Sequence, residues 1–123
     1  MDYSVSIKES SKELTKRERI AIKDTSSMNS IDAISQIDTN LTIDVAYYAI
    51  LEIHNEKAKD NTDYNNLVIA SASGEFYYTG SNSFIKSFLN IATEMGDEEF
   101  TIRVYRKPSK NYANKEFINC TIV

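Results

Sequence analysis

The chain has 123 residues, a length that fits one compact domain. Its 41% hydrophobic and 26% charged content is typical of folded soluble domains and excludes global disorder. A single cysteine (Cys120) and a single histidine (His54) exclude an internal disulfide and a Cys/His metal cage.

The start of the chain, MDYSVSIKES, lacks the apolar core of a signal peptide. No window approaches the roughly 18 consecutive apolar residues of a membrane span. We therefore expect a cytoplasmic protein that does not bind membranes.

Residues 1–40 predict an N-terminal extension with a strand and helices. Residues 3–7 alternate weakly between apolar and polar, and Ser10 with Glu13 fits a capping box that opens a short helix. Residues 17–24 alternate basic residues with isoleucines. The spacing of the isoleucines in 31–37 allows one or two further helical turns.

Residues 41–53 form the clearest predicted strand, because every odd position is apolar. These positions are Leu41, Ile43, Val45, Tyr47, Ala49, Leu51 and Ile53. The even positions, which include Tyr48, are mixed and suit a surface or a binding face. The polar run 55–66, with Lys57 and Lys59, predicts a loop.

The next segments predict a hairpin and a helix. Residues 67–72 and 76–79 flank a turn at Gly74, and this spacing favours two short antiparallel strands. Apolar residues at three- and four-residue spacing over 84–95, before Gly96, predict an amphipathic helix.

Two further strands, 100–107 and 115–122, end the predicted fold. The apolar face of the pair would hold Ile102, Val104, Ile118 and Cys120, and the other face Arg103, Tyr105, Lys107, Lys115 and Phe117.

The order from residue 41, three strands, a helix and two strands, matches the five-stranded OB barrel, whose helix lies between strands three and four. We therefore expect a mainly β, OB-like barrel over 41–123 with 1–40 as an extension, all in one domain (1–123). An α+β sheet with one packed helix has the same element order.

Charge is distributed unevenly along the chain. Residues 100–115 hold five basic and no acidic side chains, so this stretch carries +5, while the remainder, with 9 basic and 18 acidic residues, carries −9. A stretch of cations interleaved with aromatic residues is typical of single-stranded nucleic-acid binding, in which cations contact phosphates and aromatic rings stack on bases. Lys110 and Tyr112 lie in the loop between the last two strands, one wall of the OB groove, and Lys57, Lys59 and Tyr64 would supply the other wall.

The candidate nucleic-acid-binding residues are Arg103, Tyr105, Arg106, Lys107, Lys110, Tyr112, Lys115, Phe117, Tyr48, Lys57 and Lys59. Packing is the competing interpretation of the aromatic members, since Tyr105 and Phe117 could instead cover a strand face or fill a dimer interface. The basic segment 12–23 is either a solvated face or an extension of the cationic path.

No enzyme motif is present: the Walker loop, the dinucleotide glycine fingerprint, the zinc-helix motif and the nucleophile elbow are all missing. We expect a non-enzymatic protein with no cofactor and no metal. Three adjacent carboxylates at 97–99 are interpreted as a solvated turn, although they could bind a divalent cation weakly.

The runs FYYTGSNSFIKSFLNIATEM and FTIRVYRKPSKNYANKEFINCTIV resemble small single-stranded DNA-binding proteins encoded by phages of Gram-positive bacteria. The resemblance covers residues 41–123 and implies an OB fold, a homodimer or higher homo-oligomer, sequence-independent coating of single-stranded DNA, and work alongside phage recombinase or replication proteins. The implied binding region is Arg103, Tyr105, Arg106, Lys107, Lys110, Tyr112 and Lys115. Unlike the cellular single-stranded DNA-binding proteins, this chain has no tryptophan and ends in Ile122–Val123 without an acidic tail.

Two other functions fit the same composition. A small acidic phage protein could bind and inhibit a host protein, or imitate DNA if its carboxylates lie in rows on one face. A structural subunit of a virion or conjugation apparatus would use the same β-rich chain for assembly.

Overall fold

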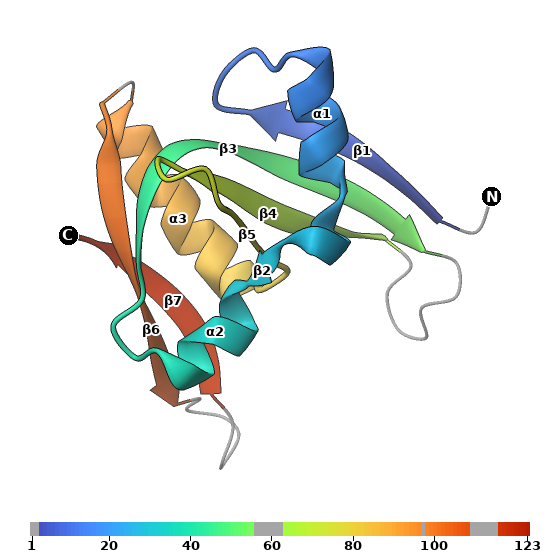
Figure 1. The fold of residues 1–123 in the computed structure, drawn as a ribbon. Helices are drawn as coiled ribbons and strands as arrows, with labels where there is room; N and C mark the ends of the chain where they lie inside the picture. The colour runs from blue at the N-terminus through green and yellow to red at the C-terminus, as the bar shows by residue number, and fades with distance from the viewer. Residues whose placement is uncertain (1–2, 56–62, 97, 109–115) are drawn as a thin grey trace.

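The computed structural model describes residues 3–55, 63–96, 98–108 and 116–123 (Figure 1). Within these residues most regular structure is β, and seven strands form one sheet in the order β2-β5-β4-β3-β6-β7, with β1 also paired to β3. The strands are β1 (Tyr3–Ser10), β2 (Asn29–Ser30), β3 (Thr42–Asn55), β4 (Asp63–Ser71), β5 (Phe76–Thr79), β6 (Phe100–Pro108) and β7 (Glu116–Ile122). The helices are α1 (Lys16–Lys23), the 3₁₀ turn η1 (Thr25–Ser27), α2 (Ile31–Ile37) and α3 (Asn82–Met95).

The long strand β3 joins two arms of the sheet. Its first residues, Thr42–Val45, pair with β6, whereas Val45–His54 pair with β4, and its second half also pairs with β1 on the other side. The sheet therefore curls strongly, as a half-barrel, around α3 (Figure 1). One arm consists of β1, the second half of β3, β4, β5 and β2, and the other arm consists of β6 and β7.

A β-bulge in β3 exchanges the two faces of the strand. The register with β4 shifts between Val45 and Tyr47, so the odd positions before and after the bulge point to opposite sides of the sheet. Val45 packs inside the curl, whereas Ala49 and Leu51 pack outside it. The odd apolar residues, which were predicted to bury one face of the strand, are thus divided between two hydrophobic clusters. The even residue Ile50 points to the inside.

An inner cluster fills the concave side of the sheet. Phe84 and Phe88 of α3 are fully buried there, as their helical spacing predicts, together with Ile102 and Val104 of β6. Ser81 caps the helix by accepting a hydrogen bond from the Phe84 amide, and Gly96 ends the helix at φ +60°.

An outer cluster fills the convex side of the first arm. Ala49, Leu51 and Ile53 of β3 and Val68 of β4 lie there at 0–1% exposure beneath Ile22 of α1. Val5 and Ile7 of β1 also pack against this cluster. Helix α1 therefore covers the outer side of β3 and β4, while β1 extends the sheet beside β3.

Several predicted elements are confirmed and others differ. The strands at 3–7, 41–53, 67–72, 76–79, 100–107 and 115–122 and the helices at 31–37 and 84–95 are confirmed, with shifts of a few residues at their ends. The five strands and one helix predicted for 41–123 are found in the predicted order, but the described sheet has seven strands and the fold three α-helices, because the N-terminal segment adds β1 and β2 to the sheet and also forms α1 and α2. Within the described residues the sheet is open, since β5 pairs with β4 and β2 and not with β7.

The prediction for residues 10–24 was wrong in detail. The capping box is formed by Thr15 and Glu18, not by Ser10 and Glu13: the Thr15 hydroxyl accepts from the Glu18 amide at 3.1 Å and the Glu18 carboxylate accepts from the Thr15 amide at 2.9 Å. Residues 17–24, which alternate like a strand, lie mostly in α1, because the cap starts a helix there and only Ile22 is buried.

Candidate nucleic-acid interface

Four of the predicted binding residues lie on the outer side of β6 and β7. Arg103, Tyr105 and Lys107 are successive outward residues of β6, and Phe117 of β7 is the cross-strand partner of Lys107. We call these four residues the basic–aromatic face. Outward residues of one strand are about 7 Å apart along the backbone, so Arg103 and Lys107 each lie one such step from Tyr105.

Buried residues on the inner side of β6 and β7 fix the position of the basic–aromatic face. Val104 of β6 pairs with Cys120 of β7, and both belong to the inner cluster. Tyr105 pairs with Asn119, whose side-chain oxygen accepts the Cys120 amide at 2.9 Å. On the same edge strand the Ile118 carbonyl accepts the Ser83 hydroxyl of α3 at 3.1 Å, which reduces the number of free edge groups.

The side chains of the face are available to a ligand. Arg103 and Lys107 are exposed, and Tyr105 and Phe117 are half-buried. Among the described residues, neither ring belongs to the inner or the outer cluster. In the same part of the chain, no ion pair involves Arg103 or Lys107. Next to this face, on β3, the Asp44 carboxylate accepts the hydroxyl of its cross-strand partner Thr101 at 2.6 Å.

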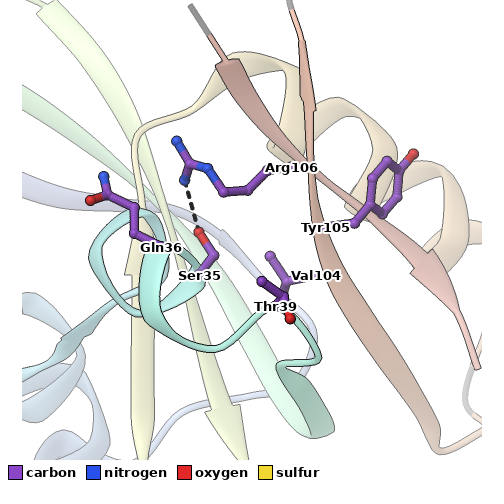
Figure 2. Close-up of a pocket in the computed structure, with 6 residues that line it drawn as sticks. All are labelled: Ser35, Gln36, Thr39, Val104, Tyr105 and Arg106. Atoms are coloured by element: carbon purple, nitrogen blue, oxygen red, sulfur yellow. Dashed lines mark hydrogen bonds between the residues drawn. The ribbon is translucent and has the colours of Figure 1, made fainter.

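Arg106 lies on the opposite side of β6. Its guanidinium donates to the Ser35 hydroxyl at 3.0 Å and to the Asp32 carbonyl at 3.4 Å, and so joins β6 to α2. A cavity of about 660 Å³ lies between these elements, lined by Ser35, Gln36, Thr39, Val104, Tyr105 and Arg106. Figure 2 shows Arg106 reaching toward Ser35, while the Tyr105 ring points away from α2.

Tyr48 is also separated from the basic–aromatic face. After the bulge it points into the curl, where its ring meets Phe88 edge-on with ring centroids 5.0 Å apart. Burial raises the pKa of its hydroxyl. The face assignment of Tyr48 depends on the bulge, which the alternating pattern of residues 41–53 did not reveal.

The remaining predicted residues, Lys57, Lys59, Lys110, Tyr112 and Lys115, lie outside the described residues. The structure therefore brings together Arg103, Tyr105, Lys107 and Phe117, and separates Arg106 and Tyr48 from them. The α2 cavity was not predicted, because the contact of Arg106 with Ser35 depends on tertiary placement alone.

Other candidate chemistry is limited in the described part of the chain. No group of three or more His, Cys, Asp or Glu residues there could hold a metal ion. The His54 ring lies 2.7 Å from the Asp63 carboxylate at the ends of β3 and β4. Cys120 is buried, and this burial raises the pKa of its thiol to about 12. No helix in the described residues is long and apolar enough to span a membrane.

Comparison with known proteins gives no relative: no family model, curated protein or solved structure matches this chain.

Proposed function

We propose that this protein binds single-stranded DNA without sequence preference, through the basic–aromatic face of β6 and β7. The observation that carries the proposal is the position of Tyr105 between Arg103 and Lys107 on one open strand face, outside both hydrophobic clusters. Aromatic rings stack on bases of any sequence, and neighbouring cations neutralise phosphates, so this arrangement suits a strand that offers both.

The topology supports an OB-like frame for this function. From β3 onward the chain runs through three strands, a helix and two strands, and the first of these strands pairs with the second and the fourth, as in an OB barrel. The finer proposal is an opened OB barrel, in which the short parallel strand β2 lies beside β5, on the edge where the last strand would close the barrel.

The binding side differs from the usual one. OB domains commonly bind oligonucleotides over their second and third strands, here β4 and β5. On their outer side Val68 of β4 is buried with Ile22 of α1, and Phe76 and Tyr78 of β5 pack against the same cluster. The proposed contact therefore lies on the last two strands, β6 and β7.

Because residues 41–123 resemble small phage single-stranded DNA-binding proteins, we further propose that the protein acts in phage DNA replication or recombination.

The competing proposal of a DNA mimic has less support, since it requires carboxylates in rows on one face. The exposed acids come from many separate elements, among them Glu9 of β1, Asp32 of α2, Glu52 of β3 and Glu94 of α3. A pull-down from host lysate that survives nuclease treatment would favour this alternative.

The test is fluorescence anisotropy of a labelled oligothymidine of about 35 nucleotides, which exceeds the site of one OB domain. Titrations at two salt concentrations, with a duplex of equal length as competitor, separate single-strand from duplex binding. We expect log K to fall with log[salt] by about 0.7 for each phosphate neutralised, and the duplex to compete poorly. An absence of binding at low salt would contradict the proposal.

A further inference from the structure

A second cationic surface lies on α1, at the other arm of the sheet. Of the 14 basic residues in the chain, five lie in 12–23 and five in 100–115. Four of the first group are on α1 and are exposed: Lys16, Arg17, Arg19 and Lys23. We call these four residues the α1 cations.

The acid within α1 is already engaged. Glu18 accepts the Thr15 amide at 2.9 Å and pairs with Lys12 at 2.7 Å, an interaction that lowers the pKa of the Glu18 carboxyl. Lys12 also lies 4.4 Å from the centre of the Tyr47 ring. The charges of Glu18 and Lys12 therefore cancel. Among the described residues, none of the α1 cations has an ion pair or hydrogen bond to its side chain.

The α1 cations and the basic–aromatic face belong to the same side of the sheet. Ile22 fixes α1 onto the outer cluster, and Arg103 and Tyr105 point outward from β6 on that same convex side. Lys16 and Lys23 are seven residues apart, about 10 Å along the helix, and Arg17 and Arg19 lie between them. Asp44 and Glu99 line a hollow over the bulge between the two arms, so the cations form two separate areas and not one groove.

We propose that the α1 cations are a second contact area for the phosphate backbone of the same single strand, which would run over the convex side from β6–β7 to α1. The inference rests on the proposed function and adds a length requirement to it. A short strand would occupy the basic–aromatic face alone, whereas a longer strand would reach both areas. The exposed Ile20 between these cations offers no ring for stacking, so this contact would be electrostatic.

The experiment compares oligothymidines of about 4 and about 40 nucleotides, which bracket the site sizes of OB domains. The test variant carries Lys16→Gln, Arg17→Gln, Arg19→Gln and Lys23→Gln together. Glutamine keeps the helix propensity of lysine and arginine, so α1 should remain folded, which circular dichroism and a melting curve would check. Lys86→Gln, an exposed lysine on α3, serves as a control for the loss of a cation elsewhere.

The α1 variant should bind the long strand at least about tenfold more weakly near 0.1 M salt, and its log K against log[salt] slope should be smaller by about 1 to 3, since each lost phosphate contact removes about 0.7. Its affinity for the short strand should stay within about twofold of wild type, which also controls for the change in net charge. An unchanged long-strand affinity, or an equal loss at both lengths, would overturn the inference while leaving the proposed function in place. Failure of the wild-type protein to bind either length would overturn both.

Discussion

The two arms of the curled sheet use the same outer side differently. On the arm of β3, β4 and β5 the outer residues include Leu51 and Val68, which are fully buried beneath α1. On the arm of β6 and β7 the outer residues include Arg103 and Tyr105, which belong to neither hydrophobic cluster. The outer side is thus buried on one arm and exposed on the other, within a single continuous sheet. We call the arm of β3, β4 and β5 the covered arm and the arm of β6 and β7 the open arm.

The difference follows from the residues at the outward positions. An outer side of leucine, isoleucine and valine must be covered, because each buried side chain of this size contributes about 1.5–3 kcal/mol that exposure would forfeit. The N-terminal segment supplies that cover through Ile22. An outer side of arginine, tyrosine and lysine can remain in water, and its rings and charges stay available to a ligand.

The largest expected effect concerns the covered arm. Ile22→Ala should lower the free energy of unfolding by about 2–5 kcal/mol, because it opens a cavity in the outer cluster. The matched control is Ile20→Ala, two residues away on the same helix and 73% exposed, which should change stability by no more than about 0.5 kcal/mol. Urea denaturation measures both. Equal effects would mean that α1 is not docked on the sheet.

The open arm should respond in binding instead of stability. Tyr105→Ala should weaken binding to oligothymidine by about 1–3 kcal/mol, the usual contribution of one stacked base. Its free energy of unfolding should change little, since the ring lies outside both clusters. Tyr105→Phe keeps the ring and should retain most of the affinity in the same anisotropy titration. A Tyr105→Ala variant that unfolds easily would show that the ring is part of the core.

The buried Cys120 thiol on the inner side of the open arm should make the free energy of unfolding fall at alkaline pH. The Cys120 thiol has its pKa raised by burial from 9.0 to about 12, so between these values the folded state keeps the proton that the unfolded state loses. Stability should therefore fall by about 1 kcal/mol per pH unit above pH 9 and show no such loss below it. Tyr77 should add to this loss above pH 10, because burial and its hydrogen bond to Glu75 raise its pKa to about 12.

Urea titrations from pH 8 to 10.5 would measure the slope of the free energy of unfolding against pH. The Cys120→Ala variant should have a smaller slope, whatever its stability at neutral pH. Equal slopes in the two proteins would contradict a buried thiol and, with it, the assignment of Cys120 to the inner side of β7.

The smallest expected effect compares two arginines on opposite sides of β6. Arg103→Gln should lower the salt slope of binding by about 0.7 and leave stability unchanged. Arg106→Gln should leave the slope unchanged and lower stability by about 1 kcal/mol, because its hydrogen bonds to Ser35 and Asp32 are lost. Anisotropy and urea denaturation of both variants would show whether the two sides of the strand are separate in function.

The sequence predicted most of the elements but not the way the sheet is covered. The Tyr105 and Cys120 faces of β6 and β7 follow from simple alternation, which holds because those strands have no bulge. Alternation failed in β3, where the shift near Tyr47 turns Tyr48 inward. A bulge depends on pairing with a distant strand, and no local pattern in residues 41–53 marks it.

The N-terminal segment was harder to predict for a related reason. The signal for α1 was present in Thr15 and Glu18, which have the same spacing as Ser10 and Glu13, and local sequence does not separate the two choices. Docking of Ile22 on the outer cluster decides between them, and that contact joins parts of the chain far apart in sequence. The contact of Arg106 with α2 depends on tertiary placement in the same way.

Nuclear magnetic resonance offers the most direct test of the open arm as the binding surface. A titration of the labelled protein with oligothymidine would follow the amide signals of both arms. We expect the largest shifts at Arg103, Tyr105, Lys107 and Phe117, with Leu51 and Val68 unchanged. Shifts confined to β4 and β5, or no shifts at an excess of the oligonucleotide, would contradict the account.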